Sequence, residues 1–199
     1  LCDYPYVALG KTVRLMAVAL NNGRPTYRSY LVVPASDQRS RSIADLEGAV
    51  FAYADPHSNT GYLVPRHELR NRGLDSEQFF RRTFFTWSHR KAVSAVAAGL
   101  AQGTAVDSYV WDSLAQVAPE LTAKTRIVWK SEEYGFPPIV AHANVSAEDF
   151  QAMQRVLIGM RDDETGRAIL ARLHLDGFIE GSPQLYDPVA AMMKTLGEH

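Results

Sequence analysis

Segments typical of β-strands alternate with segments typical of helices along almost the whole chain, and few architectures accommodate that order. Because parallel strands need long crossover connections, which are usually helices, the alternation predicts an α/β fold with largely parallel sheets. The predicted strands are 15–20, 27–33, 49–54, 82–86, 105–109, 126–129 and 139–143.

The clearest helix is predicted over 90–102, where apolar residues recur at helical spacing as far as Leu100 and Gly103 ends the pattern. Asn22-Gly23-Arg24-Pro25 predicts a hairpin turn between the first two strands. Further helices are predicted from the Ser146/Asp149 capping box to residue 159, over 164–173, and from Asp187-Pro188 to about residue 197.

Composition places the chain among folded globular proteins, since 46% of the residues are hydrophobic and 22% are charged. A net charge of -1 without a long run of Lys or Arg argues against a nucleic-acid partner. No apolar stretch approaches the ~20 residues that cross a bilayer. Cys2 is the single cysteine, which excludes an internal disulfide and a cysteine-rich metal site.

Sequence motifs for catalysis and for cofactors are missing. The chain contains no Gly-x-Ser-x-Gly elbow and no glycine-rich phosphate loop of the Walker or dinucleotide kind. Its six histidines have no spacing typical of metal ligands. We therefore expect no cofactor and no metal, and chemistry on a ligand is not indicated.

A polar turn after the strand 49–54 predicts a binding site for an anion. Asp55-Pro56 ends the strand, and Ser58 is a favoured N-cap residue for a following helix. The first amides of a helix lack partners within it, and together with the helix dipole they attract phosphate, sulfate or carboxylate. Ser58, Asn59 and Thr60 add side-chain donors at this point, while Pro65 must make the helix kink or restart.

Two further strand-to-helix junctions carry polar residues with open interpretations. His89 is either a donor to the same anion or a histidine at the edge of the core, and the following Arg90-Lys91 pair favours a nearby anion or is simply a solvated basic pair. Asp107 lies within an apolar strand, where it either accepts backbone amides or accepts a protonated ligand oxygen, which would favour a phosphate or phosphonate monoanion and repel a fully ionised sulfate.

These segments together resemble the substrate-binding proteins of phosphonate, phosphite and phosphate ABC transporters. The resemblance rests on Asp55–Pro65, Ser88-His89 before Ala92-Val93, Val106-Asp107, Asp3–Val7, Ser42–Gly48, Asp176–Phe178 and Tyr186–Pro188. It covers nearly the whole chain.

The resemblance implies a type II periplasmic binding protein-like α/β fold, with two lobes joined by crossover hinge strands. Residues 1–33 would form part of lobe one and the hinge, 34–132 lobe two, and 133–199 the return to lobe one with the C-terminal helices. The opening βαβ units of lobe one have no counterpart in the sequence, so this lobe is expected to be incomplete at its N-terminus.

Position by position, the resemblance implies ligand contacts from Tyr6 of lobe one and from a set in lobe two comprising Ser58, Asn59, Thr60, His89 and Asp107. Tyr4 and Tyr109 are weaker candidates. Asn59 departs from the family's usual hydroxyl residue, and Cys2-Asp3 departs from its usual Gly-Pro.

The main functional hypothesis is therefore a non-catalytic solute-binding protein, periplasmic or extracytoplasmic and monomeric, that captures a small phosphorus oxyanion for an ABC permease. No signal sequence is present in this chain. The alternative is the ligand-sensing domain of a membrane signalling receptor with the same fold. A third hypothesis, ranked last, is a hydrolytic triad of Ser58, His89 and Asp107.

Overall fold

The computed structural model describes residues 1–198, and His199 lies outside them. The chain divides into two compact units. The first unit consists of Leu1–Tyr27 and Glu133–Ala191, and the second of Arg28–Glu132 and the chain from Met192 onward. Within residues 1–198, no helix combines the length and the apolar character needed to cross a bilayer.

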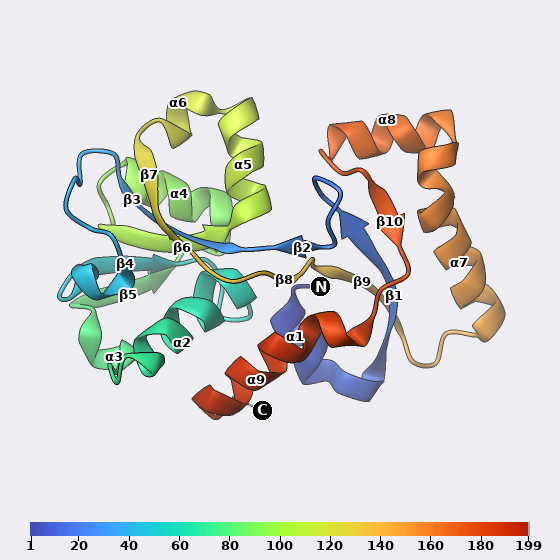
Figure 1. The fold of residues 1–199 in the computed structure, drawn as a ribbon, viewed down its shortest axis with the longest axis horizontal. Coiled ribbons are helices and arrows are strands. Elements are labelled where there is room, and N and C mark those ends of the chain that lie inside the picture. Colours follow the sequence, from blue (N-terminus) through green and yellow to red (C-terminus); the bar gives the residue numbers. More distant parts are fainter. Residues whose placement is uncertain (199) are drawn as a thin grey trace. The chain divides into compact units, whose positions relative to one another are not determined.

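The first unit is built on an antiparallel sheet with the strand order β10-β1-β9 (Figure 1). A two-stranded ladder of β2 with β8 lies where the chain leaves this unit and returns to it. Its strands are β1 (Val13–Leu20), β2 (Thr26–Tyr27), β8 (Tyr134–Gly135), β9 (Pro138–His142) and β10 (Gly177–Ile179). Its helices and helical turns are α1 (Asp3–Leu9), η1 (Gly10–Thr12), α7 (Ala147–Gly159), η4 (Met160–Asp162), α8 (Glu164–Arg172), η5 (Pro183–Tyr186) and α9 (Asp187–Leu196), within which the division falls.

The second unit is an α/β layer structure around a five-stranded sheet of order β5-β4-β6-β3-β7. Its strands are β3 (Ser29–Pro34), β4 (Val50–Tyr53), β5 (Arg82–Phe85), β6 (Gly103–Asp107) and β7 (Thr125–Lys130). Its helices and helical turns are η2 (Ile43–Leu46), η3 (Asn59–Leu63), α2 (Val64–Asn71), α3 (Ser76–Phe79), α4 (His89–Ala97), α5 (Ser108–Val117) and α6 (Pro119–Thr122).

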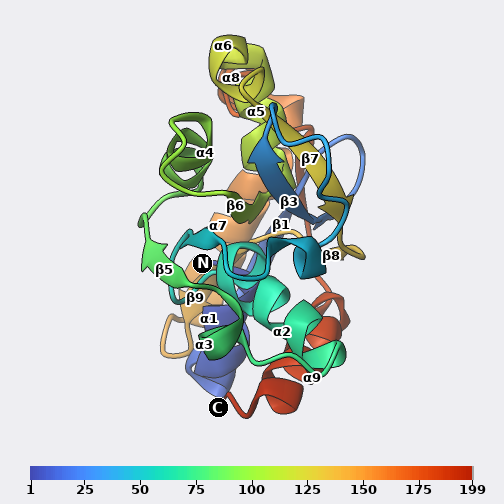
Figure 2. The same ribbon diagram turned by 90° about the vertical axis from the view of Figure 1, so that its left-hand side faces the viewer.

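Both faces of this sheet are covered, as the period-two alternation of side chains along a buried strand requires. In β3, Tyr30 and Val32 pack with residues of α4 and α5, whereas Leu31 and Val33 pack with residues of α2 and α3. Figures 1 and 2 show α4 and α5 on one side of the sheet and α2 with α3 on the other. Each fully buried aliphatic side chain contributes about 1.5–3 kcal/mol, so this sheet is a rigid platform for the loops at its edge.

The prediction of largely parallel sheets was wrong. Only β4 runs parallel to its neighbours β5 and β6, whereas β3 is antiparallel to both β6 and β7. The predicted hairpin is also absent, because the turn at 22–25 closes only the isolated bridge Asn21–Arg24. The predicted strand 27–33 is instead divided into β2 and β3, which pair with distant strands.

Two element boundaries also differ from the prediction. Helix α4 ends at Ala97 rather than at residue 102, because Gly99 adopts a left-handed φ of 74° that stops the helix. Leu100 therefore lies outside the helix and is 67% exposed. The strand predicted over 105–109 ends at Asp107, where the side chain caps helix α5. The N-cap at Ser146 and the helices that follow it are confirmed, since Oγ of Ser146 accepts the amide of Asp149. The capping box is only half formed, because the carboxylate of Asp149 accepts the hydroxyl of Ser146 and not its backbone amide.

Candidate functional site

Three strand-to-helix junctions meet at one edge of the sheet in the second unit. The strands β5, β4 and β6 are adjacent and parallel, so their carboxyl ends lie at the same edge. Helical segments start after each of them, with η3 at Asn59, α4 at His89 and α5 at Ser108. In open α/β sheets, ligands bind outside the carboxyl ends of the strands. The three junctions picked out in the sequence are therefore brought together.

Ser58 caps a π-helical turn, η3, rather than an ordinary α-helix. Its Oγ accepts the amide of Gly61 at 3.0 Å, and its carbonyl accepts the amide of Leu63 at 3.1 Å, five residues ahead. This wide turn leads directly into α2, which contains Pro65 at its start. The expected kink or restart at Pro65 is confirmed.

The π-turn also accounts for the carbonyls that Pro65 leaves without an amide. The carbonyl of Gly61 accepts the amide of Ala54 at 3.3 Å, and the carbonyl of Thr60 accepts the hydroxyl of Ser29 at 2.7 Å. A buried unpaired carbonyl would cost about 1–3 kcal/mol, so these two bonds stabilise the turn in its wide form. Ser29 is a supporting residue that the sequence did not reveal, because the bond joins elements 31 residues apart.

Gly61 was also missed as a residue of the site. A Cβ at this position would lie 2.4 Å from Cβ of Ala54 and 3.0 Å from both Cε1 of His89 and Oγ of Ser58. Only glycine lets the turn approach the strand and His89 this closely. The signal in the sequence that could have identified Gly61 is its position directly after the polar residues Ser58, Asn59 and Thr60.

The imidazole of His89 bridges two junctions. Its Nδ1 accepts the backbone amide of Asp107 at 3.3 Å, and its Nε2 lies 3.4 Å from Oγ of Ser58. Because Nδ1 acts as an acceptor, the single proton of a neutral imidazole must be on Nε2. The side chain of His89 therefore donates toward Ser58.

Desolvation keeps this imidazole neutral. Although part of its surface reaches solvent, the surrounding protein lowers the pKa of His89 to about 4, against a smaller opposing effect of the Asp55 carboxylate. Ser58 Oγ then accepts from two N–H groups, those of Gly61 and His89, so its own proton remains to be donated elsewhere.

Asp107 is buried at the N-terminus of α5. Its Oδ1 accepts the amides of Tyr109 at 2.8 Å and Val110 at 3.3 Å, which confirms the interpretation of this residue as an acceptor of backbone amides. Burial raises the pKa of Asp107 to about 7, and the two amide bonds oppose that rise only in part. This carboxyl group can therefore change its protonation state near neutral pH.

Asn59 and Thr60 are both completely buried in the first turn of η3. In the described part of the chain, Oγ1 of Thr60 has no hydrogen-bond partner. Such a group normally costs free energy, and buried hydroxyls are nearly always paired. The hydroxyl of Thr60 is an exception to this rule, and it lies in the turn that Ser58 caps.

The other candidate residues lie at the surface, in α5 or in the first unit. Arg90 and Lys91 are exposed, which is the arrangement of a solvated basic pair. Tyr109 is partly buried in the first turn of α5. Tyr4 and Tyr6 belong to α1 of the first unit, where the ring of Tyr6 meets that of Tyr186 edge-on at 4.7 Å. The contribution of Tyr6 to a ligand site remains a prediction.

The geometry does not match a hydrolytic triad. In such a triad, Nδ1 of the histidine donates to the carboxylate, and Nε2 accepts the proton of the serine. Here the amide of Asp107 donates to Nδ1 of His89, so Nε2 carries the proton and cannot take another from Ser58. Among residues 1–198, no group of three His, Cys, Asp or Glu side chains is placed to hold a metal ion.

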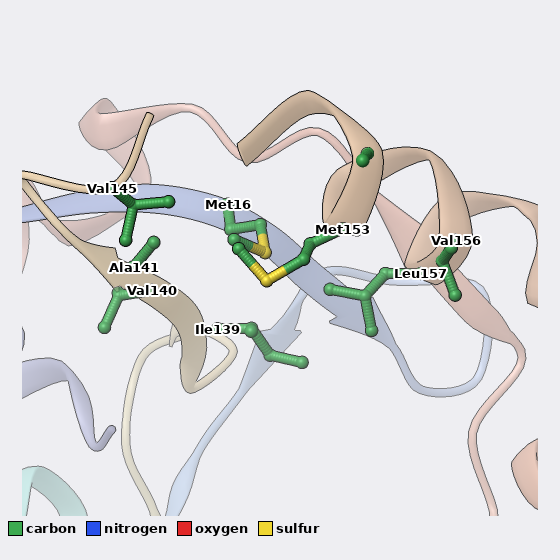
Figure 3. Close-up of a pocket in the computed structure, with 9 residues that line it drawn as sticks. Met16, Ile139, Val140, Ala141, Val145, Met153, Val156 and Leu157 are labelled. Atoms are coloured by element: carbon green, nitrogen blue, oxygen red, sulfur yellow. The ribbon is translucent and has the colours of Figure 1, made fainter. Parts of the chain in front are cut away.

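A wide cavity of about 610 Å³ lies in the first unit, between β1, β9 and α7. Figure 3 shows the side chains of Met16 and Met153 meeting in it, with Leu157 and Ile139 nearby. All nine lining residues are apolar, so the cavity offers no side-chain donor to an anion. The polar edge of the second unit is therefore the better candidate site.

Comparisons with known proteins agree on one family. The family described as "ABC transporter, phosphonate, periplasmic substrate-binding protein" matches residues 1–186. The phosphonates-binding periplasmic protein of Escherichia coli (strain K12) is 27% identical over 156 residues, which represent 76% of this chain and 46% of that protein. This chain thus spans about half the length of that curated relative.

Solved structures agree in fold. A binding protein component of an ABC phosphonate transporter from Pseudomonas aeruginosa matches with a TM-score of 0.87 at 21% identity, covering 98% of this chain and 67% of that one. A protein from Prochlorococcus marinus (MIT 9301), solved in complex with methylphosphonate, matches with a TM-score of 0.83 at 18% identity, covering 94% and 72%. The type II periplasmic binding protein fold and the family resemblance predicted from the sequence are confirmed.

Proposed function

The chain belongs to the periplasmic substrate-binding proteins of phosphonate ABC transporters, and from that premise we propose that it captures a small phosphorus oxyanion and delivers it to an ABC permease. The ligand is a phosphonate, phosphite or phosphate. The protein works outside the cytoplasm, as a monomer, and without chemical turnover. The family description favours this transport role over the sensor of a signalling receptor, the alternative that the sequence left open.

The observation that carries the proposal is the hydroxyl of Thr60, which is buried and has no hydrogen-bond partner in the described residues. A ligand oxygen would satisfy it and would recover the free energy that its burial costs. The neighbouring hydroxyl of Ser58, whose proton is left over after two N–H groups have bonded its oxygen, would donate to the same ligand.

The other contacts follow from the same edge of the sheet. The first-turn amides of η3 and the side chain of Asn59 would contact the remaining oxygens, as helix N-termini do with anions. His89 contributes as a neutral donor, either directly or through Ser58, and Tyr6 is proposed from the family resemblance alone. Such a set of uncharged donors suits a tetrahedral anion that is held and later released.

Asp107 is proposed to select among tetrahedral anions. One carboxyl oxygen caps α5, and the other is left to accept a proton of the ligand. A phosphonate or phosphate monoanion carries such a proton, whereas sulfate does not at neutral pH. The carboxylate would therefore repel sulfate.

Isothermal titration with phosphate, phosphite, methylphosphonate, aminoethylphosphonate and sulfate tests the proposal. We expect binding of at least one phosphorus oxyanion with a Kd of about 1 µM or tighter, equivalent to about 8 kcal/mol. Phosphorus NMR of the same mixtures should show the ligand unchanged. Heat with sulfate alone would refute the role of Asp107, and ligand hydrolysis would refute the non-catalytic assignment.

A further inference from the structure

Strand β5 forms one edge of the five-stranded sheet in the second unit (Figure 2), and no strand within residues 1–198 pairs with its outer side. The amides of Arg81 and Thr86, next to its two ends, donate to the carbonyls of Ala49 and Tyr53, so the inner side of the strand is bonded along β4. The outer side of an edge strand presents main-chain donors and acceptors that can pair with another strand.

A groove runs between β5 and helix α4. It consists of two hollows of about 280 Å³ and about 400 Å³, which adjoin because Phe84 and Leu100 line both. Arg82, Phe84 and Thr86 line it from β5, since side chains two positions apart lie on the same face of a strand. The groove therefore follows the length of the edge strand.

Helix α4 covers the centre of the sheet better than its edge. Its Val93 and Val96 are buried together with Ala52 of β4, whereas Phe84 of β5 is only partly buried against the same cluster. Leu100, just beyond the helix, is 67% exposed. A partner that covered Phe84 and Leu100 would remove apolar surface from water, which favours association.

The groove is positively charged. Arg82 lines one hollow and Lys91 the other, and both side chains are exposed. Among residues 1–198, no carboxylate forms an ion pair with either of them, and no Asp or Glu belongs to the described lining of the two hollows. An apolar floor with an unpaired cation in each part complements a segment that is apolar in its middle and acidic at its ends.

We propose that β5 and this groove bind an extended segment of a partner protein, apolar in its middle and acidic at both ends, which adds to the sheet as a further strand. In this mode of recognition, main-chain hydrogen bonds supply affinity and the groove supplies specificity. From Arg82 to Thr86 the strand covers about 13 Å, so about seven residues span it with some overlap at each end. A flat membrane surface would leave the groove unfilled, which favours a peptide as the occupant.

The probe for the test is the fluorescein-labelled heptapeptide Asp-Thr-Val-Thr-Leu-Thr-Asp, whose acidic and apolar side chains lie on one face of an extended strand. Fluorescence anisotropy should show saturable binding to the protein. Replacement of both Asp by Lys should weaken binding about tenfold. N-methylation of alternate peptide amides should abolish binding for one of the two alternate sets only, because only one side of the added strand bonds to β5.

Arg82→Glu and Lys91→Glu should each weaken peptide binding about fivefold or more, with an unchanged Tm because both side chains are exposed. Lys124→Glu is the matched control. Lys124 is exposed and directly precedes β7, which is the opposite edge of the same sheet, so this variant should bind the peptide as the wild type does.

Three results would overturn the inference: no saturable binding of the acidic peptide, equal weakening by all three charge reversals, and equal effects of the two N-methylated sets. Vesicles of phosphatidylglycerol and phosphatidylcholine are the second probe. Binding to these vesicles that Arg82→Glu reduces, without binding of the peptide, would assign the surface to a membrane and would also overturn it. None of these results depends on which anion the protein binds, so the proposed function is tested separately.

Discussion

The backbone amide of Asp107 donates to Nδ1 of His89 across a distance of 3.3 Å. This one bond places the imidazole proton on Nε2, directs that proton toward Ser58, and leaves the serine hydroxyl as a donor. The carboxyl group of the same aspartate caps its own helix. A main-chain amide thus determines which side-chain atoms of the site donate hydrogen bonds and which accept them.

Thr60→Val should separate binding from folding. The hydroxyl of Thr60 has no partner in the described residues, so its replacement by a methyl group should leave the free energy of unfolding unchanged or slightly raised. Ligand affinity should fall about tenfold or more, because one donor to the anion is lost. Urea unfolding and isothermal titration measure the two quantities.

Thr104→Val is the control for that experiment. Thr104 is equally buried, but its hydroxyl donates to the carbonyl of Ala52 at 2.6 Å. Its replacement should cost about 1–3 kcal/mol of stability and leave affinity nearly unchanged. If Thr60→Val lost stability to the same extent while binding normally, the hydroxyl would have a structural role only.

Ser58→Ala should impair both stability and binding. It removes the N-cap of η3, which costs about 1 kcal/mol, and it removes a ligand donor, which should weaken binding by about 10- to 100-fold. Ser146→Ala removes the comparable cap of α7 in the other unit. It should lose similar stability and no affinity. Equal affinities of the two variants in titration would exclude Ser58 from the ligand site.

The stability of the protein should depend on pH through two opposing groups. Burial lowers the pKa of His89 from 6.5 to about 4, so its contribution is complete above 6.5 and is lost as the pH falls toward 4. Burial raises the pKa of Asp107 from 3.8 to about 7, so its contribution is complete below 3.8 and is lost as the pH rises toward 7. Between these limits the two effects partly cancel in the wild type.

Single substitutions should expose each effect. The stability of the wild type minus that of His89→Gln should increase between about pH 4.5 and about pH 6.5, whereas the same difference for Asp107→Asn should decrease. Asparagine preserves the cap of α5, which isolates the titration from the loss of the cap. Urea unfolding across this range checks both signs, and parallel curves for all three proteins would show that neither group titrates there.

Gly61→Ala should disrupt the site through steric overlap. The added methyl group would lie 2.4 Å from Cβ of Ala54 and would press on His89, so we expect a loss of about 1–3 kcal/mol and weaker ligand binding. Gly159→Ala is the control, because a Cβ there meets nothing within 4 Å and the φ is -75°. It should stabilise the protein by about 0.4–1 kcal/mol in thermal unfolding. A Gly61→Ala variant as stable as the wild type would contradict the tight turn.

Local signals in the sequence were sufficient for most elements and for the caps at Ser58 and Ser146. Most of the predicted strands and both of these caps were readable because each depends on residues within about four positions of one another. Errors arose where distant contacts decide the outcome. The pairing of β3 with β6 and β7, which makes the sheet mixed, depends on strands more than 70 residues away.

By itself, the sequence determined that three polar junctions follow three apolar strands and that donors are concentrated after β4. Only the tertiary structure decided their roles. It placed the amide of Asp107 against an imidazole 18 residues earlier in the chain and closed the π-turn through a hydroxyl of β3. It also left the hydroxyl of Thr60 buried without a hydrogen-bond partner among residues 1–198. Which atom donates, which accepts and which is buried depends on the groups that tertiary packing brings within about 3 Å of one another. These groups come from distant parts of the chain, so local sequence patterns do not specify them.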